Sequence, residues 1–178
     1  LRPGGKLVLN AACAPLVKAA QDDEIFVSTL NVAWFAADPR CRTFDEALRN
    51  GEETACVREG VLVYQCGPHR EYVLAVSEAG FAFGGLAQHN VENALAAILA
   101  ARGLGIGWPA IREGLRTFAS NPADNPGRAN MLLLHGGRVM LDFAHNAEGV
   151  RHIVGLAKAL PATRRLITLG QAGDRTDE

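Results

Sequence analysis

The order of apolar segments in residues 138–169 places the tightest limit on the fold of this chain. Residues 138–143 predict a strand, residues 147–160 a helix with one apolar face, and residues 165–169 a second strand. A strand–helix–strand order of this length favours two parallel strands joined by a right-handed crossover. We therefore expect an α/β fold in this part of the chain.

The residues before 120 predict a second, larger group of short strands and helices. Strands are expected at residues 7–10, 25–32, 57–66, 71–77 and 81–85, with a hairpin turn at Gly67-Pro68. The clearest helix runs from Val91 to Arg102, with Asn90 as its N-cap. Other helices are expected near residues 14–20, 44–49 and 109–118. Residues 120–128 are rich in Asn, Pro, Asp and Gly and predict a linker between two domains.

Composition excludes several classes of partner. The net charge of −1 gives no electrostatic attraction to nucleic acid or to an anionic membrane. No apolar run reaches the ~18 residues of a membrane span. The four cysteines are scattered without a Cys-x-x-Cys pair, so no metal site is predicted and a reduced, cytoplasmic chain is expected. Because the sequence starts at Leu1 and stops at Glu178, we expect a fragment of a longer protein.

The turn between the strand at 138–143 and the following helix carries the strongest candidates for chemistry. Asp142, His145 and Asn146 lie there, at the sheet edge where α/β proteins bind ligands. The helix start offers free N–H groups for a phosphate, and the second predicted strand leads to Asp174 and Arg175 at the same edge. The structural alternative is that Asn146 caps the helix, Asp142 accepts from a neighbouring N–H, and His145 is a surface residue.

Two further positions suit a nucleotide. Asn90 and Asn93 are three residues apart on a predicted helix, so both side chains lie on one face. Paired amides match an adenine edge, although a cap followed by a polar first turn is the better explanation from the local pattern. Arg128 follows Pro126-Gly127 and is either a nucleotide contact between domains or a solvated linker charge.

Two glycine-rich segments are not nucleotide motifs. Residues 103–107 follow a helix rather than a strand and do not form the Gly-x-Gly-x-x-Gly pattern of dinucleotide binding. Residues 4–7 lack the Ser/Thr and the upstream glycine of a P-loop. Neither segment therefore predicts a phosphate cradle.

Six motifs in their order resemble those of the Mur ligase superfamily, and within it the cyanophycin synthetase family. The resemblance extends over nearly the whole chain. The motifs are Leu-Arg-Pro-Gly-Gly with Val-Leu-Asn at residues 1–10, Gly-Gly-x-Ala-x-His-Asn-x-x-Asn at 84–93, and the segments at 111–118, 126–130, 142–146 and 173–175.

This resemblance implies a domain organisation. Residues 1–121 would form the later part of the central ATPase domain, residues 122–128 a linker, and residues 129–178 the start of a Rossmann-like C-terminal domain. Both domains would be incomplete. Members of the superfamily use ATP and Mg²⁺ to convert a carboxylate into an acyl phosphate, which an amine then attacks.

The resemblance also implies roles for the candidate residues. Asn90 and Asn93 would bind the adenine, and Arg128 and Asp142 would lie near the ribose and phosphates. The remaining candidates would line the cleft between the domains: Asn146 as a nucleotide contact, and His145, Asp174 and Arg175 as catalytic groups.

The chain departs from the family pattern in one informative place. Residues 11–15 read Ala-Ala-Cys-Ala-Pro where the family commonly has Ala-Asp-Asp-Pro, so any contact of those acids is lost. Smaller departures are Phe143 for the usual tyrosine and Ala147 for the usual proline. The family's P-loop and its magnesium-binding carbamylated lysine would lie before Leu1. We therefore predict that this chain alone does not hydrolyse ATP.

The most direct interpretation is an ATP-dependent carboxylate–amine ligase that adds aspartate or arginine to a peptide polymer. A homo-oligomeric full-length protein is compatible with it. Two alternatives stay open: a ligase for peptidoglycan precursors, and a non-catalytic nucleotide-binding module. The altered segment at residues 11–13 is what keeps the non-catalytic module open.

Overall fold

The computed structural model describes residues 2–23 and 27–170. These residues divide into two compact units, Leu1–Phe118 and Ala119–Glu178. Within the described residues, no helix has the length and apolar character needed to cross a membrane.

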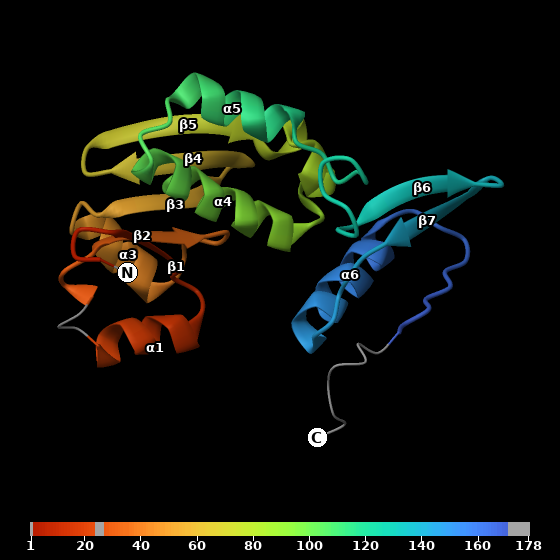
Figure 1. The fold of residues 1–178 in the computed structure, drawn as a ribbon, viewed down its shortest axis with the longest axis horizontal. Helices are drawn as coiled ribbons and strands as arrows, with labels where there is room; N and C mark the ends of the chain where they lie inside the picture. Colours follow the sequence, from red (N-terminus) through yellow and green to blue (C-terminus); the bar gives the residue numbers. More distant parts are fainter. Residues whose placement is uncertain (1, 24–26, 171–178) are drawn as a thin grey trace. The chain divides into compact units, whose positions relative to one another are not determined.

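The first unit is built on a mixed five-stranded sheet with strand order β1-β2-β3-β4-β5 (Figure 1). The first three strands pair in parallel and the last two pairs are antiparallel. The strands are β1 (Lys6–Asn10), β2 (Asn31–Ala36), β3 (Glu53–Arg58), β4 (Val61–Cys66) and β5 (His69–Ala75). The α/β class predicted from the sequence is therefore confirmed for this unit.

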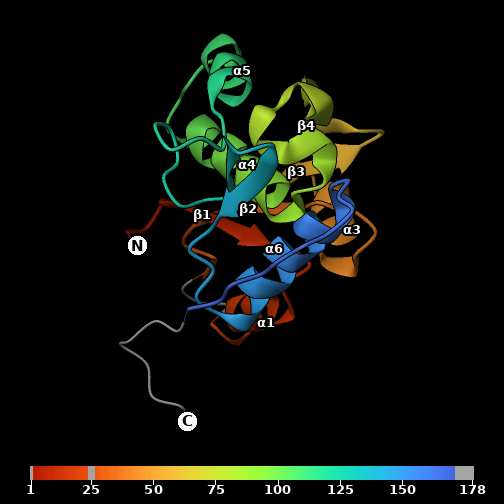
Figure 2. The same ribbon diagram turned by 90° about the vertical axis from the view of Figure 1, so that its right-hand side faces the viewer.

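Helices cover both faces of this sheet. They are α1 (Ala14–Asp22), α3 (Arg42–Arg49), α4 (Gln88–Gly103) and α5 (Trp108–Thr117), with two short 3₁₀ segments, Val76–Glu78 and Gly80–Gly85, between β5 and α4. Helix α4 contacts β1 to β4, whereas α3 contacts β2 and β3. The view turned by 90° shows the same layers edge-on (Figure 2).

The alternation of side chains along β2 explains why the sheet has two buried faces. Ala33 and Phe35 point into the larger core beneath α4 and α5, whereas Trp34 and Ala36 point toward α3. Successive strand residues face opposite sides, so a continuous apolar strand needs a helix on each side. The face of α4 that meets the sheet consists of buried residues, namely Val91, Ala94, Leu95, Ile98 and Leu99.

Helix α5 is fixed to the edge strand by one arginine. Arg112 forms an ion pair with Glu71, and its Nε donates to the carbonyl oxygen of Val73 (3.0 Å). Both side chains of the ion pair are partly buried, so solvent screens this pair less than an exposed one. These bonds attach α5 to β5 beside the apolar contacts of Ile111 and Leu115.

The second unit contains a β-hairpin and a helix. Strands β6 (Asn130–Leu134) and β7 (Gly137–Leu141) pair antiparallel, and α6 (Ala147–Ala159) follows. The hairpin turn is His135-Gly136, where φ is +46° and +78°. Two consecutive left-handed residues are the geometry of a tight hairpin turn, and the glycine adopts it without strain.

The predicted parallel strand at residues 165–169 is wrong. These residues form no regular element, and the two described strands of the unit pair antiparallel. Arg165 instead donates to the carbonyl oxygens of Ala157 (2.8 Å) and Leu160 (2.7 Å) at the end of α6. A guanidinium satisfies carbonyls that the end of a helix leaves without partners, and here it holds the segment against the helix.

Three predictions for the first unit are also corrected. The strand expected at residues 25–32 lies at Asn31–Ala36; residues 27–30 are helix and turn, and residues 24–26 lie outside the described part. The strand expected at 57–66 is two strands, because the chain turns at Glu59-Gly60, both with positive φ. Residues 81–85 lie in a 3₁₀ segment rather than a strand, and a kink at Phe83 and Gly84, both with positive φ, interrupts it.

Replacing Leu95 by alanine tests the packing of α4 against the sheet. The side chain is fully buried, so we expect the free energy of unfolding of the first unit to fall by about 2–5 kcal/mol. Urea denaturation followed by tryptophan fluorescence measures it, because Trp34 and Trp108 both lie in this unit. The control Leu104→Ala, at an 80% exposed position, should change stability by less than about 0.5 kcal/mol. Equal losses in both variants would contradict the packing described.

Candidate functional site

The start of α4 holds the first group of predicted site residues. The helix begins at Gln88 after the N-cap residue Ala87, so Asn90 lies inside its first turn and the prediction that Asn90 is the N-cap is wrong. The Asn90 Nδ2 instead donates to the carbonyl oxygen of Phe81 (2.8 Å). Asn93, one turn further along the helix, is exposed. The two amides therefore share a helix face, as predicted from their spacing.

A strained turn precedes this helix. Phe83, Gly84 and Gly85 all have positive φ, at +49°, +66° and +93°. Phenylalanine pays a conformational cost in this region, so neighbouring contacts must hold it there. A Cβ on Gly85 would lie 3.4 Å from a methyl carbon of Val76, which is a tight contact. The Gly-Gly pair of the predicted motif therefore serves to reverse the chain between β5 and α4.

The carboxyl end of β1 lies beside the same helix start. The Asn10 Nδ2 donates to Glu92 Oε2 over a long 3.5 Å, and its Oδ1 accepts from the Ala12 N–H (2.9 Å). Neither Asn10 nor Glu92 was predicted from the sequence to belong to a site. The available signal was the position of Asn10 at the carboxyl end of a buried strand, where ligand-binding residues collect in α/β sheets.

In the second unit, two predicted motifs are hydrogen-bonded to each other. The Ala129 N–H donates to Asp142 Oδ2 (2.8 Å), and the Phe143 N–H donates to the carbonyl oxygen of Gly127 (2.8 Å). We call these paired segments, residues 125–130 and 142–143, the motif clasp. Ala129 has φ +48°, an unfavourable value for alanine that its bond to Asp142 stabilises.

Asn130 is the centre of the motif clasp. Its Oδ1 accepts from the Gly127 N–H (2.7 Å), and its Nδ2 donates to the carbonyl oxygens of Asn125 (2.9 Å) and Arg128 (3.2 Å). The side chain is 2% exposed, so a lost partner would leave a buried polar group unsatisfied. Asn130 belongs to the motif at residues 126–130, but its structural role was not predicted from the sequence.

The side chains beside the motif clasp form an exposed row. The Arg128 guanidinium carbon lies 5.7 Å from the centre of the Phe143 ring, and that ring lies 5.4 Å from the His145 ring. His145 Nδ1 is 3.2 Å from the carbonyl oxygen of Phe143. A cation, an aromatic face and an imidazole are therefore held together on one side of the second unit.

At the turn between β7 and α6, the three candidate side chains make the contacts that their structural roles predict. Asn146 is the N-cap of α6 and accepts from the Gly149 N–H (2.8 Å), Asp142 accepts from a backbone N–H, and His145 is exposed. These contacts position the three side chains and leave their predicted nucleotide roles untested. Asp174 and Arg175 lie outside the described residues.

The described residues do not assemble a metal site. Across residues 2–23 and 27–170, no three His, Cys, Asp or Glu side chains are grouped so that they could hold a metal ion.

Comparison with known proteins places these motifs in a family of ligases. The chain is 34% identical over 178 residues to the cyanophycin synthetase of Synechocystis sp., and 28% identical over 176 residues to that of Trichormus variabilis. These alignments cover 98% and 99% of the chain but 19% of each relative. The UDP-N-acetylmuramoylalanine–D-glutamate ligase of Rubrobacter xylanophilus is 32% identical over 165 residues, which is 79% of the chain and 36% of that protein. No protein-family model matches the chain.

These relatives confirm the predicted resemblance to the Mur ligase superfamily and, within it, to cyanophycin synthetase. Each relative named above is a ligase or synthetase, which is the class of enzyme that the sequence predicted. The chain spans about a fifth of the length of the cyanophycin synthetases that it matches.

Replacing Asn130 by alanine tests the motif clasp. We expect the backbone amide of Gly127, which donates to Asn130 Oδ1, to exchange with solvent at least about tenfold faster, because the lost buried bond costs about 1–3 kcal/mol. Hydrogen exchange followed by NMR measures this directly. Asn125→Ala is the matched control, since Asn125 contributes its backbone carbonyl, which alanine retains. Unchanged exchange in the Asn130 variant would show that the motif clasp does not depend on this side chain.

Proposed function

We propose that this chain is part of an ATP-dependent ligase that joins a carboxylate to an amine, of the cyanophycin synthetase type. The observation that carries the proposal is the motif clasp. It joins two motifs that resemble the family's and fixes Arg128, Asp142 and His145 in one cluster. Similarity along nearly the whole chain to cyanophycin synthetases supports the same conclusion.

Asn90 is suited to the adenine of ATP. Its Nδ2 donates to the Phe81 carbonyl oxygen, which fixes the orientation of the amide, and the amide oxygen is an acceptor. An adenine amino group donates to such an oxygen. Asn93 adds a second exposed amide on the same helix face. A preoriented amide loses little side-chain entropy on binding, which favours this site over a mobile one.

The second unit supplies groups suited to a nucleotide and its phosphates. Arg128 is exposed and rests against Phe143, so its guanidinium is available to an anionic ligand. Asp142 Oδ2 accepts from the Ala129 N–H, and a carboxylate has further lone pairs for a ribose hydroxyl. His145 is exposed, and an imidazole nitrogen can donate to a phosphate or accept a proton from a reacting group. ATP, when bound, would supply the phosphoryl group that activates the carboxylate.

We infer that the two units belong to the two domains that the resemblance implies. In our proposal, residues 1–121 are the later part of the central ATPase domain, residues 122–128 the linker, and residues 129–178 the start of the C-terminal domain. Asp174 and Arg175 would join His145 as catalytic groups, and Mg²⁺ would act with ATP. The substrates would be an amino acid and a peptide polymer.

A cell-wall ligase is the second candidate function. UDP-N-acetylmuramyl-tripeptide synthetase of Lactococcus lactis is 33% identical over 91 residues, which is 51% of the chain and 18% of that protein. That alignment is shorter than those to the cyanophycin synthetases, which favours the first candidate.

Phosphate release by the full-length protein distinguishes these functions. With ATP, Mg²⁺, a cyanophycin primer, aspartate and arginine, we expect release that requires the primer and an amino acid together. A parallel reaction with a UDP-muramyl peptide should release none. Release with the muramyl substrate alone would contradict the cyanophycin-type assignment, and no release in either reaction would favour a non-catalytic module.

The 178-residue chain is expected to release no phosphate from ATP, because it lacks the P-loop motif that cradles the β- and γ-phosphates. A phosphate assay on the purified chain, with the full-length protein as positive control, measures this. ATP turnover by the isolated chain that persists after a second purification would overturn the expectation.

A further inference from the structure

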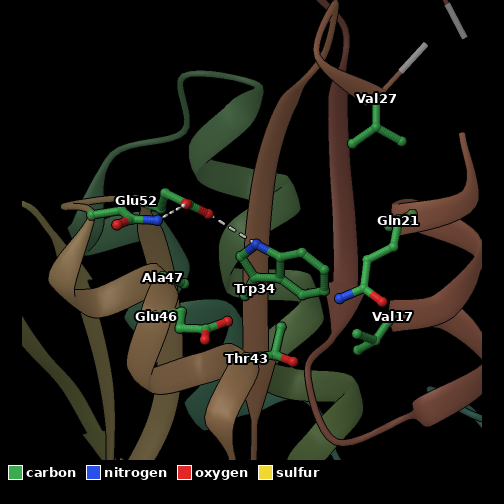
Figure 3. A pocket seen from close by; sticks show the side chains of 10 residues that line it. Val17, Gln21, Val27, Trp34, Thr43, Glu46, Ala47 and Glu52 are labelled. Atoms are coloured by element: carbon green, nitrogen blue, oxygen red, sulfur yellow. Dashed lines mark hydrogen bonds between the residues drawn. The ribbon is translucent and has the colours of Figure 1, made fainter. Parts of the chain in front are cut away.

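A cavity of about 330 Å³ lies in the first unit on the face of the sheet that carries α3 (Figure 3). Helices α1 and α3 form its two sides, and Trp34 of β2 stands between them. Ten residues line it, and none is among the residues predicted to bind nucleotide. In Figure 3, Gln21 reaches toward the indole from α1, while Thr43 and Glu46 face it from α3.

The way that α1 is attached explains why this space stays open. No residue of α1 is buried, whereas α3 buries Phe44 and Ala47 against the sheet. Alternation along β2 turns Trp34 toward this side, where it is partly exposed. A large aromatic ring at the floor of an open cavity offers a binding face that the protein's own core does not use.

Hydrogen bonds fix an acidic group beside the indole. The Trp34 Nε1 donates to Glu52 Oε2 (3.0 Å), and the Asn50 Nδ2 donates to Glu52 Oε1 (3.0 Å). A second carboxylate, Glu46 of α3, also lines the cavity, on the same side of Trp34 as Glu52 (Figure 3). Its bond to Arg42 (2.7 Å) lowers the pKa of Glu46, so it remains ionised at neutral pH. Arg42 itself is not among the lining residues.

The lining selects for positive charge. It contains two glutamates and, among the ten described lining residues, no Lys, Arg or His. An indole face attracts a cation through its quadrupole, and carboxylates near it add to that attraction. Val17 and Ala47 supply apolar surface for an aliphatic stem. An aromatic face, apolar walls and two anions are the features of a site for an organic cation.

We propose that this cavity binds a monovalent organic cation, an amine or guanidinium carried on a short alkyl chain. The cationic head would lie over the Trp34 ring between Glu46 and Glu52, with its stem against the apolar wall. This inference does not depend on the ligase function, because it uses only the cavity between α1 and α3.

Tryptophan fluorescence tests the proposal with n-butylguanidinium as the probe. The chain has two tryptophans, so the full chain carrying Trp108→Phe reports on Trp34 alone. We expect a saturable change in emission with n-butylguanidinium and at least about tenfold weaker binding of n-butylurea, its uncharged isostere. Equal binding of the two probes, or no saturable response, would overturn the proposal.

Two charge-removing variants test the assignment of the carboxylates. Glu52→Gln removes the negative charge but retains one side-chain oxygen that can accept from Trp34 or Asn50. We expect it to weaken binding of n-butylguanidinium about tenfold. Glu46→Gln, on the surface of α3, should also weaken it and remains informative if the first variant misfolds. The matched control is Glu113→Gln, at an exposed position on α5 outside the cavity. This variant should bind n-butylguanidinium with unchanged affinity. If the affinity for n-butylguanidinium is unchanged in both cavity variants, the proposed site is refuted.

Discussion

The packing of α4 against the sheet is the interaction on which the first unit depends. Its buried face contacts four of the five strands, and the loss of water from this surface is the main stabilising term available to a unit of this size. The helix also positions the predicted site residues of its first turn. Because its first turn follows a left-handed turn at Phe83–Gly85, Asn90 is held on the Phe81 carbonyl, and Glu92 reaches Asn10 at the carboxyl end of β1.

The second unit is stabilised differently. Its described residues bury few large apolar side chains, Leu156 being the principal one, and the motif clasp contributes a network of buried polar bonds instead. Such networks specify geometry closely, because every member must be satisfied at once. That property suits a site in which Arg128, Asp142 and His145 have to keep fixed positions relative to one another.

The sequence predicted most reliably those elements whose signal is local and periodic. Helices α5 and α6 and the hairpin at Gly67-Pro68 were all found close to their observed limits. The missed turn at Glu59-Gly60 has another cause: a glutamate adopts positive φ there, and no propensity rule predicts that. The segment 165–169 has the composition of a strand, but a strand forms only where a neighbour offers paired hydrogen bonds. Arg165 directs it to the end of α6 instead.

The motifs, the α/β class and the likeness to Mur ligases were determined by the sequence alone, because they depend on residue order. Tertiary structure decided which of the named residues meet. Asn90 bonds to the Phe81 carbonyl and Asp142 to the Ala129 amide, contacts that arise from a left-handed turn in each case. The cavity around Trp34 was likewise invisible in the sequence. It exists because two separate helices, α1 and α3, flank one residue of β2. The spacing between these helices is set by packing rather than by any local sequence pattern.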